Sequence, residues 1–199
     1  MNYLAHLLLS PDDKLSRLGN IMGDFMRDVD PDALPPLVWE GIQLHRRIDA
    51  YTDSHTIVRD LRKLFSVERR RFSGVILDVV FDHFLIKHWE QYTSHNFNIF
   101  VDECYADLWE GRQLMPERME MVVGWMIKRD WIRSYAELEH VGRALDGLAG
   151  RIKRDHGFHG ALEEVQANYD AIDKGFQAFF PQLKAHVKKA KKVLPHEPK

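Results

Sequence analysis

Apolar residues recur every three or four positions along most of this chain, which is the spacing of one buried face of an α-helix. The pattern is clearest in the stretches 15–25, 97–108, 116–127 and 161–183. Alternation of apolar and polar residues, the mark of a half-buried strand, does not extend over any useful length, and there is no internal repeat. We therefore predict an all-α fold: a single-domain multi-helix bundle of about seven to nine helices over residues 1–199.

Two predicted helices in the first half of the chain carry acids and a histidine in rows. Each row repeats every four residues, and residues four apart lie on one face of a helix. The rows are His45, Asp49 and Asp53 in a helix expected over 36–63, and Asp78 and Asp82 in a helix expected over 74–92. Each step of four turns the direction by about 40°, so His45 and Asp49 are better aligned than all three members of the first row.

The second row interrupts a helix that is otherwise apolar on all sides. A helix of that kind is normally buried, and a buried carboxylate must be paired, hydrogen-bonded or metal-bound because an isolated buried charge is very costly. We interpret the two rows as the facing walls of a metal site in a bundle core. For any single residue, an ion pair with a neighbouring arginine or histidine is the simpler alternative.

The candidate ligands are carboxylates and imidazoles without a thiolate, a set that suits Mn²⁺, Mg²⁺ or Fe²⁺ better than a structural zinc ion. Five residues are predicted to lie nearest the metal: Asp24, His45, Asp49, Asp78 and Asp82. Four more are candidates for further ligands, supporting groups or proton donors: His6, Asp53, His55 and His83. Taken alone, His6 reads better as a hydrogen-bonded histidine of the core.

Such a metal site suits the hydrolysis of a phosphoester. A bound divalent ion polarises a phosphoryl oxygen and makes a nucleophile from water near neutral pH. Arg46 directly follows His45 and is predicted to clamp the phosphate, because a guanidinium group offers a planar, bidentate fork. His55 and His83 are the predicted catalytic histidines.

The composition of the chain limits which kinds of partner it can bind and in which cellular compartment it is expected. A net charge of −2 gives no bulk electrostatic footprint for nucleic acid. The single cysteine, Cys104, excludes a disulfide framework and favours the cytoplasm. The first residues do not read as a signal peptide, and no apolar run reaches the roughly 20 residues of a membrane span. The basic stretch 59–71 and the lysine-rich tail from about residue 184 are either solvated or docking surfaces for an acidic partner.

Several motifs stand in the order found in one known family. They are Asn2-Tyr3-Leu4-Ala5-His6, Leu18-Gly19-Asn20 with Gly23-Asp24-Phe25, Leu44-His45-Arg46 with Ile48-Asp49 and Thr52-Asp53, and Leu77-Asp78 with Phe81-Asp82-His83-Phe84. With these motifs the chain resembles the bacterial acyl carrier protein phosphodiesterase family. The resemblance runs nearly end to end and is densest before residue 92.

The resemblance implies a cytosolic, Mn²⁺-dependent enzyme that cleaves 4'-phosphopantetheine from the serine of holo-acyl carrier protein, an acidic protein. It also implies a distant, HD-domain-like relationship to metal-dependent phosphohydrolases. Those enzymes carry an adjacent His-Asp pair, whereas this chain has the reverse pair, Asp82-His83, so their ligands cannot be transferred. Two alternatives remain: a metal-dependent phosphohydrolase acting on a nucleotide or other small phosphoester, and a helical module that binds an acidic partner without catalysis.

Overall fold

The computed structural model describes residues 1–149 and 158–191, and those residues form helices joined by short loops, with no strand among them. The α-helices are α1 (Tyr3–Leu9), α2 (Lys14–Met22), α3 (Pro36–Ser54), α4 (Thr56–Leu61), α5 (Val67–Arg70), α6 (Ser73–Lys87), α7 (Trp89–Tyr92), α8 (Phe97–Glu110), α9 (Glu117–Lys128), α10 (Trp131–Ser134), α11 (Leu138–Ala149), α12 (Ala161–Ala167) and α13 (Tyr169–Lys191). Short 3₁₀ helices are η1 (Gly23–Phe25), η2 (Pro31–Ala33), η3 (Arg62–Leu64) and η4 (Arg112–Leu114).

The all-α prediction is confirmed, but the predicted number of helices is too low for the described part of the chain. Three of the α-helices, α5, α7 and α10, have only four residues each. Helix α7 lies within the helix predicted over 74–92, which is divided at His88, and the helix predicted over 36–63 is divided at His55. Apolar periodicity finds helices that bury a long face, and a single helical turn is too short to show it.

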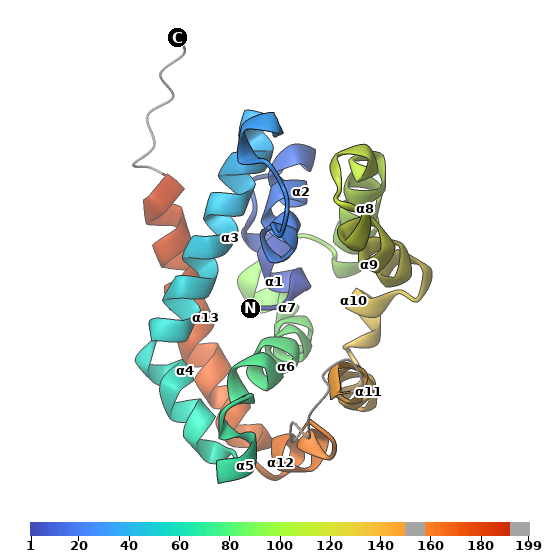
Figure 1. The fold of residues 1–199 in the computed structure, drawn as a ribbon. Coiled ribbons are helices and arrows are strands. Elements are labelled where there is room, and N and C mark those ends of the chain that lie inside the picture. The colour runs from blue at the N-terminus through green and yellow to red at the C-terminus, as the bar shows by residue number, and fades with distance from the viewer. Residues whose placement is uncertain (150–157, 192–199) are drawn as a thin grey trace.

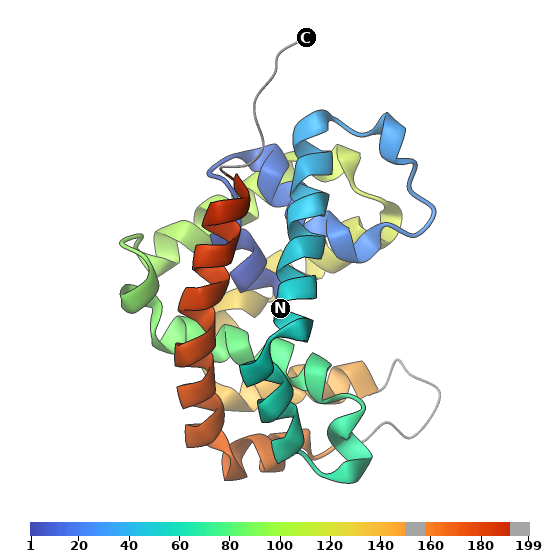
Figure 2. The same cartoon turned by 90° about the vertical axis from the view of Figure 1, so that its left-hand side faces the viewer.

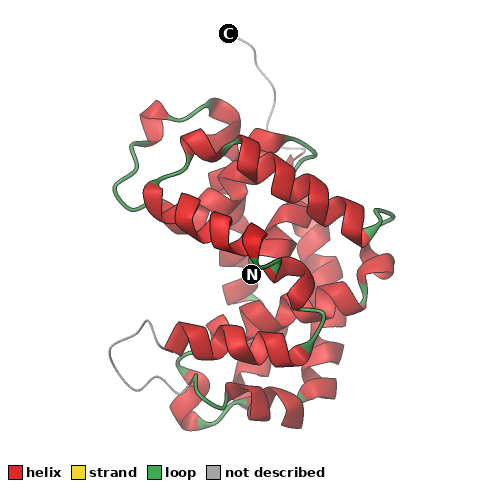
Figure 3. Ribbon diagram, turned by 90° about the vertical axis from the view of Figure 1, so that its right-hand side faces the viewer, coloured by secondary structure: helices red, strands yellow, loops and turns green. Residues whose placement is uncertain are grey.

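Helix α6 lies inside the bundle, as its apolar sequence predicts. Phe81 and Phe84 are fully buried, and their rings pack against Phe176 and Phe179 of α13. Helix α13 runs beside α3 and α4 along one side of the molecule, while α8 to α11 cover the opposite side (Figures 1 and 2). Coloured by secondary structure, the opposite side is likewise entirely helix and loop (Figure 3).

The backbones of helices α2 and α3 are in close contact, and two glycines permit it. A Cβ atom on Gly19 would lie 2.0 Å from the carbonyl oxygen of Val38 in α3. A Cβ atom on Gly41 of α3 would lie 2.5 Å from the carbonyl oxygen of Ser16 in α2. No real Cβ atom tolerates such distances, so the two backbones are in contact only because both positions lack a side chain.

The predicted helix over 36–63 is wrong in one respect, because it breaks at His55. The hydroxyl groups of Thr52 and Ser54 donate to the carbonyl oxygens of Ile48 and Ala50, which gives the last turn of α3 local side-chain partners. The backbone of His55 is then extended, and its Nδ1 atom accepts from the next turn as the N-cap of α4.

Ser134 followed three residues later by Glu137 is the sequence of a capping box and predicts that a helix begins there, but this prediction is wrong. Ser134 ends α10, and its hydroxyl donates to the carbonyl oxygen of Trp131 at 2.7 Å. Helix α11 begins afterwards, at Leu138.

The lysine-rich end of the chain is helical as far as the structure describes it. Helix α13 continues to Lys191, and Lys184 donates to the backbone carbonyl of Tyr92. The predicted tail beyond this point, 192–199, lies outside the described residues. Among the described helices, none combines the length and the apolar character that crossing a bilayer requires.

Asp82 joins α6 to the start of α1. Its Oδ2 atom accepts from the backbone N–H of Leu4 at 3.0 Å, and its Oδ1 atom accepts from that of Ala5 at 3.2 Å. These are two of the first-turn amides that have no partner inside a helix, and Asn2 at the N-cap provides no side-chain bond. Burial raises the pKa of Asp82 to about 7, although these two amides act in the opposite direction.

We expect Gly19→Ala to destabilise the protein by about 1–3 kcal/mol or more, because the new methyl group forces α2 and α3 apart. Gly124→Ala is the matched control. Gly124 also lies within a helix, but a Cβ atom there meets nothing within 4 Å, so this variant should gain up to about 1 kcal/mol. Urea denaturation of both variants checks the pair, and equal stabilities would contradict the packing argument.

We expect Asp82→Ala to destabilise the protein more than Asp82→Asn. The alanine leaves two buried amides of α1 unpaired, at about 1–3 kcal/mol each, whereas asparagine keeps one acceptor oxygen. Thermal unfolding followed by circular dichroism measures the difference. If the two variants unfold at the same temperature, Asp82 does not hold α1.

Candidate metal centre

Two histidines and an aspartate from α1 and α3 meet in the interior. The Nε2 atom of His6 lies 3.2 Å from Oδ1 of Asp49, and the Nε2 atom of His45 lies 3.0 Å from Oδ2 of the same carboxylate. One ligand atom from each residue falls within 4.8 Å of the other two. Both histidines are buried, and the Asp49 side chain is 35% exposed. The i, i+4 pair of α3 is therefore completed by a histidine from another helix.

Asn20, at the end of α2, fixes the orientation of both imidazole rings. Its side-chain Oδ1 atom lies 2.8 Å from Nδ1 of His6, and its backbone oxygen lies 2.7 Å from Nδ1 of His45. Its amide group donates to the carbonyl oxygen of His6 and the hydroxyl of Ser10, which assigns Oδ1 to the side facing the ring. Both Nδ1 atoms then carry the proton, and both Nε2 atoms turn toward Asp49.

The two rings are also held by packing. They stack with centroids 4.2 Å apart at an interplanar angle of 17°. On the far side of His45 lies Gly23, where a Cβ atom would come within 2.2 Å of the ring. Any side chain at that position would push the His45 ring out of place.

This arrangement requires a positive charge. In the neutral tautomer that Asn20 selects, each Nε2 atom presents a lone pair, and here two lone pairs face a carboxylate. Burial lowers the pKa of His45, but hydrogen bonds and charges from Asp24 and Asp49 outweigh it and raise that pKa to about 9. Burial lowers the pKa of His6. A proton on His45 satisfies its contact with Asp49, but Nε2 of His6 still faces Asp49 and the carbonyl oxygen of Met1 at 3.1 Å. A cation bound between the three groups satisfies both rings.

The amino group of Met1 provides one positive charge beside the cluster. It lies 3.1 Å from Oδ1 of Asp49 and 3.0 Å from Oδ1 of Asp78. Burial alone would lower its pKa, but the carboxylates of Asp78 and Asp49 raise it to about 10. For Asp49, burial favours the neutral acid, yet His45, His6 and this ammonium group hold its pKa well below the ordinary value. Asp78 therefore lies one contact away from the cluster.

Asp24 approaches the cluster from η1, on the solvent side. Its Oδ1 atom lies 3.4 Å from Nε2 of His45, and its side chain is 51% exposed. The structure thus brings together four of the five residues that were predicted to lie nearest the metal: Asp24, His45, Asp49 and Asp78. The fifth predicted ligand, Asp82, is fully buried nearby, with both oxygens accepting from the amides of α1.

The structure does not bring Asp53 or His55 to the cluster. Asp53 forms an exposed ion pair with Arg62 at 2.7 Å. His55 lies beyond the end of α3, where its ring packs near Tyr51 and Phe179.

His83 and Arg46 are likewise engaged elsewhere. His83 has Nδ1 at 2.9 Å from the backbone oxygen of Tyr135 and Nε2 at 2.9 Å from the hydroxyl of Tyr169. Arg46 is exposed, and its guanidinium group lies over the ring of Trp39.

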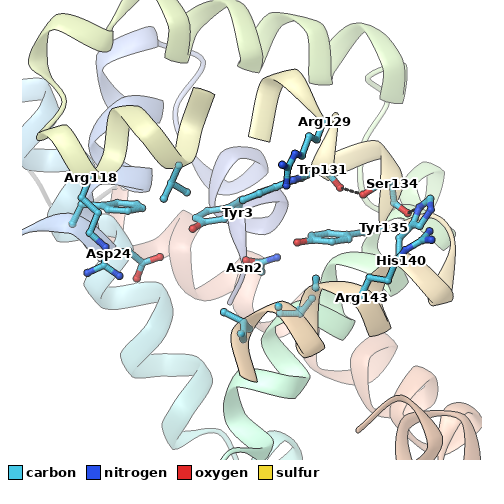
Figure 4. A pocket seen from close by; sticks show the side chains of 16 residues that line it. Asn2, Tyr3, Asp24, Arg118, Arg129, Trp131, Ser134, Tyr135, His140 and Arg143 are labelled. Carbon is cyan, nitrogen blue, oxygen red and sulfur yellow. Dashed lines mark hydrogen bonds between the residues drawn. The ribbon is translucent and has the colours of Figure 1, made fainter. Parts of the chain in front are cut away.

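A cleft of about 690 Å³ opens beside the cluster, between the N-terminal segment and helices α9 to α11. Asp24 and Arg118 stand at one end, Tyr3 and Asn2 line the middle, and Arg143 lies at the other end (Figure 4). Asp24 lines the cleft and also lies 3.4 Å from His45, so this one residue connects the cleft with the cluster. Its volume falls in the usual range of small-molecule sites, about 300–1,000 Å³.

Sequence reasoning missed Asn20 and Arg118. Asn20 lies in the Leu18-Gly19-Asn20 motif, but a pattern of apolar positions shows nothing of a side chain that bridges two distant rings. Arg118 lies in the C-terminal half, where the motifs are sparse, and only the folded structure shows that it lines the same end of the cleft as Asp24 (Figure 4).

The donor set fits a divalent ion. Two imidazole nitrogens with fixed tautomers and carboxylate oxygens from separate helices are typical of metal sites in helical bundles. Hydrogen bonds from the opposite ring nitrogens to an oxygen acceptor are the usual support for histidine ligands. The cluster supplies both features, and they arise from three helices.

Comparisons with known proteins agree with the motifs. The model of a protein family described as acyl carrier protein phosphodiesterase matches residues 1–183. A protein of Serratia proteamaculans named acyl carrier protein phosphodiesterase is 37% identical over 189 residues, 94% of this chain and 98% of the relative. A protein of the same name from Escherichia coli is 35% identical over 191 residues, 93% of this chain and 96% of the relative. No solved structure matches. The chain belongs to the acyl carrier protein phosphodiesterase family.

Proposed function

We propose that this protein is a metal-dependent phosphodiesterase that hydrolyses the 4'-phosphopantetheine–serine phosphodiester of holo-acyl carrier protein and releases the apo-protein. Family membership supports the substrate, since the relatives carry that activity in their names. The observation that carries the chemistry is the convergence of two imidazole Nε2 atoms on Asp49, with the other nitrogen of each ring fixed by Asn20.

His6, His45 and Asp49 would hold the ion, with Asp24 and Asp78 flanking them as the remaining carboxylates. We assign Asp82 a supporting role, because both of its oxygens are engaged by α1, the helix that carries His6. The ammonium group of Met1 lies against the same carboxylates. It offsets part of their negative charge.

Mn²⁺ is the ion we propose. Two nitrogen ligands disfavour Mg²⁺, which prefers oxygen ligands and retained water, while imidazole and carboxylate together suit Mn²⁺ or Fe²⁺. When bound, the ion polarises a phosphoryl oxygen and lowers the pKa of water.

The hydrolysis replaces one bond to phosphorus by another. A water oxygen forms the new bond, the bond from phosphorus to the serine oxygen breaks, and the serine oxygen takes a proton. The stacked rings of His6 and His45 and the carboxylate of Asp49 hold the ligand atoms in fixed positions. Little reorganisation of the protein is then needed when substrate binds. Asp24, on the open side, is the carboxylate nearest to an entering substrate.

The roles predicted for Arg46, His55 and His83 stay predictions, as do the HD-like arrangement and the cytoplasmic location. The contacts of these three side chains lie outside the cluster. Single alanine variants assayed on holo-carrier protein decide each role.

We expect the protein to remove 4'-phosphopantetheine from holo-acyl carrier protein when Mn²⁺ is present and not after treatment with a chelator. Mass spectrometry of the carrier protein measures the loss. His45→Ala should abolish turnover and lower Mn²⁺ affinity, because one of two imidazole ligands is removed. If the wild-type protein leaves the carrier protein intact with Mn²⁺, Mg²⁺ and Fe²⁺ in turn, the proposed function is wrong.

We expect Asn20→Ala to lower Mn²⁺ affinity by about 10–100-fold, since the His6 ring loses the acceptor that orients it. His45 keeps its acceptor, which is a backbone oxygen. Asn98→Ala is the control, because Asn98 is exposed on α8 and its side-chain oxygen accepts from Arg133, outside the cluster. Titration calorimetry measures both affinities, and an unchanged value for Asn20→Ala would remove Asn20 from the metal centre.

A further inference from the structure

The cleft beside the cluster carries unbalanced positive charge. Arg118, Arg129 and Arg143 line it, and Asp24 is the one acid among its lining residues. Within residues 1–149 and 158–191, none of the three arginines forms an ion pair. Clefts lined by one sign of charge concentrate ligands of the opposite sign. The cleft therefore favours an anion.

The basic stretch 59–71 has less positive charge available for docking an acidic partner than its sequence suggests. Arg62 pairs with Asp53, Lys63 pairs with Asp60, and Arg69 pairs with Glu164 of α12. Those three cations are neutralised within the fold. The arginines of the cleft are not, so unpaired positive charge lies next to the candidate metal centre.

The rest of the lining suits a long, mostly uncharged ligand. Val79, Val122 and Leu148 provide apolar surface, and Trp131 and Tyr135 add aromatic rings. Asn2 and Tyr135 add polar groups: the buried amide of Asn2 lies beside the hydroxyl of Tyr135 (Figure 4). An amide and a hydroxyl can both donate to an acceptor oxygen of a ligand. The pantetheine arm has amide carbonyl oxygens along an otherwise flexible chain.

We propose that this cleft receives the 4'-phosphopantetheine arm of the carrier protein and that Arg118 binds the phosphodiester. The proposal rests on the proposed function and adds its substrate site. Arg118 stands at the end of the cleft where Asp24 contacts the cluster, so a phosphodiester held there lies between the arginine and the metal centre (Figure 4). The arm then extends between α9, α10 and α11.

Replacement of Arg118 tests the phosphate contact. Arg118→Ala should lower kcat/KM for holo-carrier protein by about 100-fold, as removal of a donor to developing charge does elsewhere, with Mn²⁺ affinity unchanged. Arg47→Ala is the matched control, because Arg47 is an exposed arginine of α3 outside the cleft. Arg46→Ala is measured in parallel. A loss with Arg46→Ala and none with Arg118→Ala would overturn the assignment.

A pair of glycines tests the position of the arm. Gly147 lines the cleft one turn after Arg143 on α11, and a Cβ atom there meets nothing within 4 Å. Gly147→Phe should therefore fold normally and fill the cleft, raising KM for holo-carrier protein by about tenfold or more. Gly124→Phe places the same ring on α9, also in open space and outside the cleft, and should leave KM unchanged.

The small substrate bis(p-nitrophenyl) phosphate separates the two proposals. It needs the metal centre and Arg118 but carries no pantetheine, so Gly147→Phe should hydrolyse it at the wild-type rate. An equal loss on both substrates, or equal KM values for the two phenylalanine variants, would overturn the assignment of the arm. Wild-type protein that releases no 4'-phosphopantetheine would instead overturn the proposed function itself.

Discussion

The candidate site depends on a single asparagine that holds two imidazole rings. Asn20 accepts from His6 through its side chain and from His45 through its backbone, so both rings are locked in the same tautomer. The consequence is electrostatic: two nitrogen lone pairs and the carboxylate of Asp49 face one another in the interior. Lone pairs and negative charge repel at this distance; a proton on His45 relieves part of that repulsion, and a bound cation relieves it for both rings. The fold therefore favours the binding of a positive charge at this position.

The scaffold explains how Asn20 reaches both rings. His45 lies on α3 and Asn20 on α2, and the two helices touch through their backbones at Gly19 and Gly41. His6 comes from α1, whose first amides are held by Asp82 of α6. Substitution at any of these contacts moves a ring relative to Asp49. Packing and metal chemistry therefore place requirements on the same residues.

The sequence predicts part of this arrangement of side chains, and helix geometry explains why. His45 and Asp49 share a face of α3. Each further step of four residues turns the side-chain direction by about 40°, and Asp53 is already directed away from the cluster, where it forms an exposed ion pair with Arg62. The two acids of α6 stand out in an apolar helix, but only Asp82 is buried, the Asp78 side chain being 34% exposed, and periodicity does not distinguish a ligand from a cap. Asp78 faces the ammonium group of Met1, while Asp82 accepts from backbone amides. Contacts between distant elements, such as those of His6, Asn20 and Arg118, leave no periodic signal.

If the proposed function holds, the juxtaposition of acids and arginines also governs how the substrate binds. Asp24, Asp49 and Asp78 together would repel a phosphodiester, and the nearby ammonium group offsets only part of that charge. A bound divalent ion reverses the sign locally, and Arg118 extends the positive region along the cleft. Without the ion, the acids oppose the entry of an anion at the end where hydrolysis takes place. Metal binding and substrate binding are then coupled through charge alone, with no movement of a helix required.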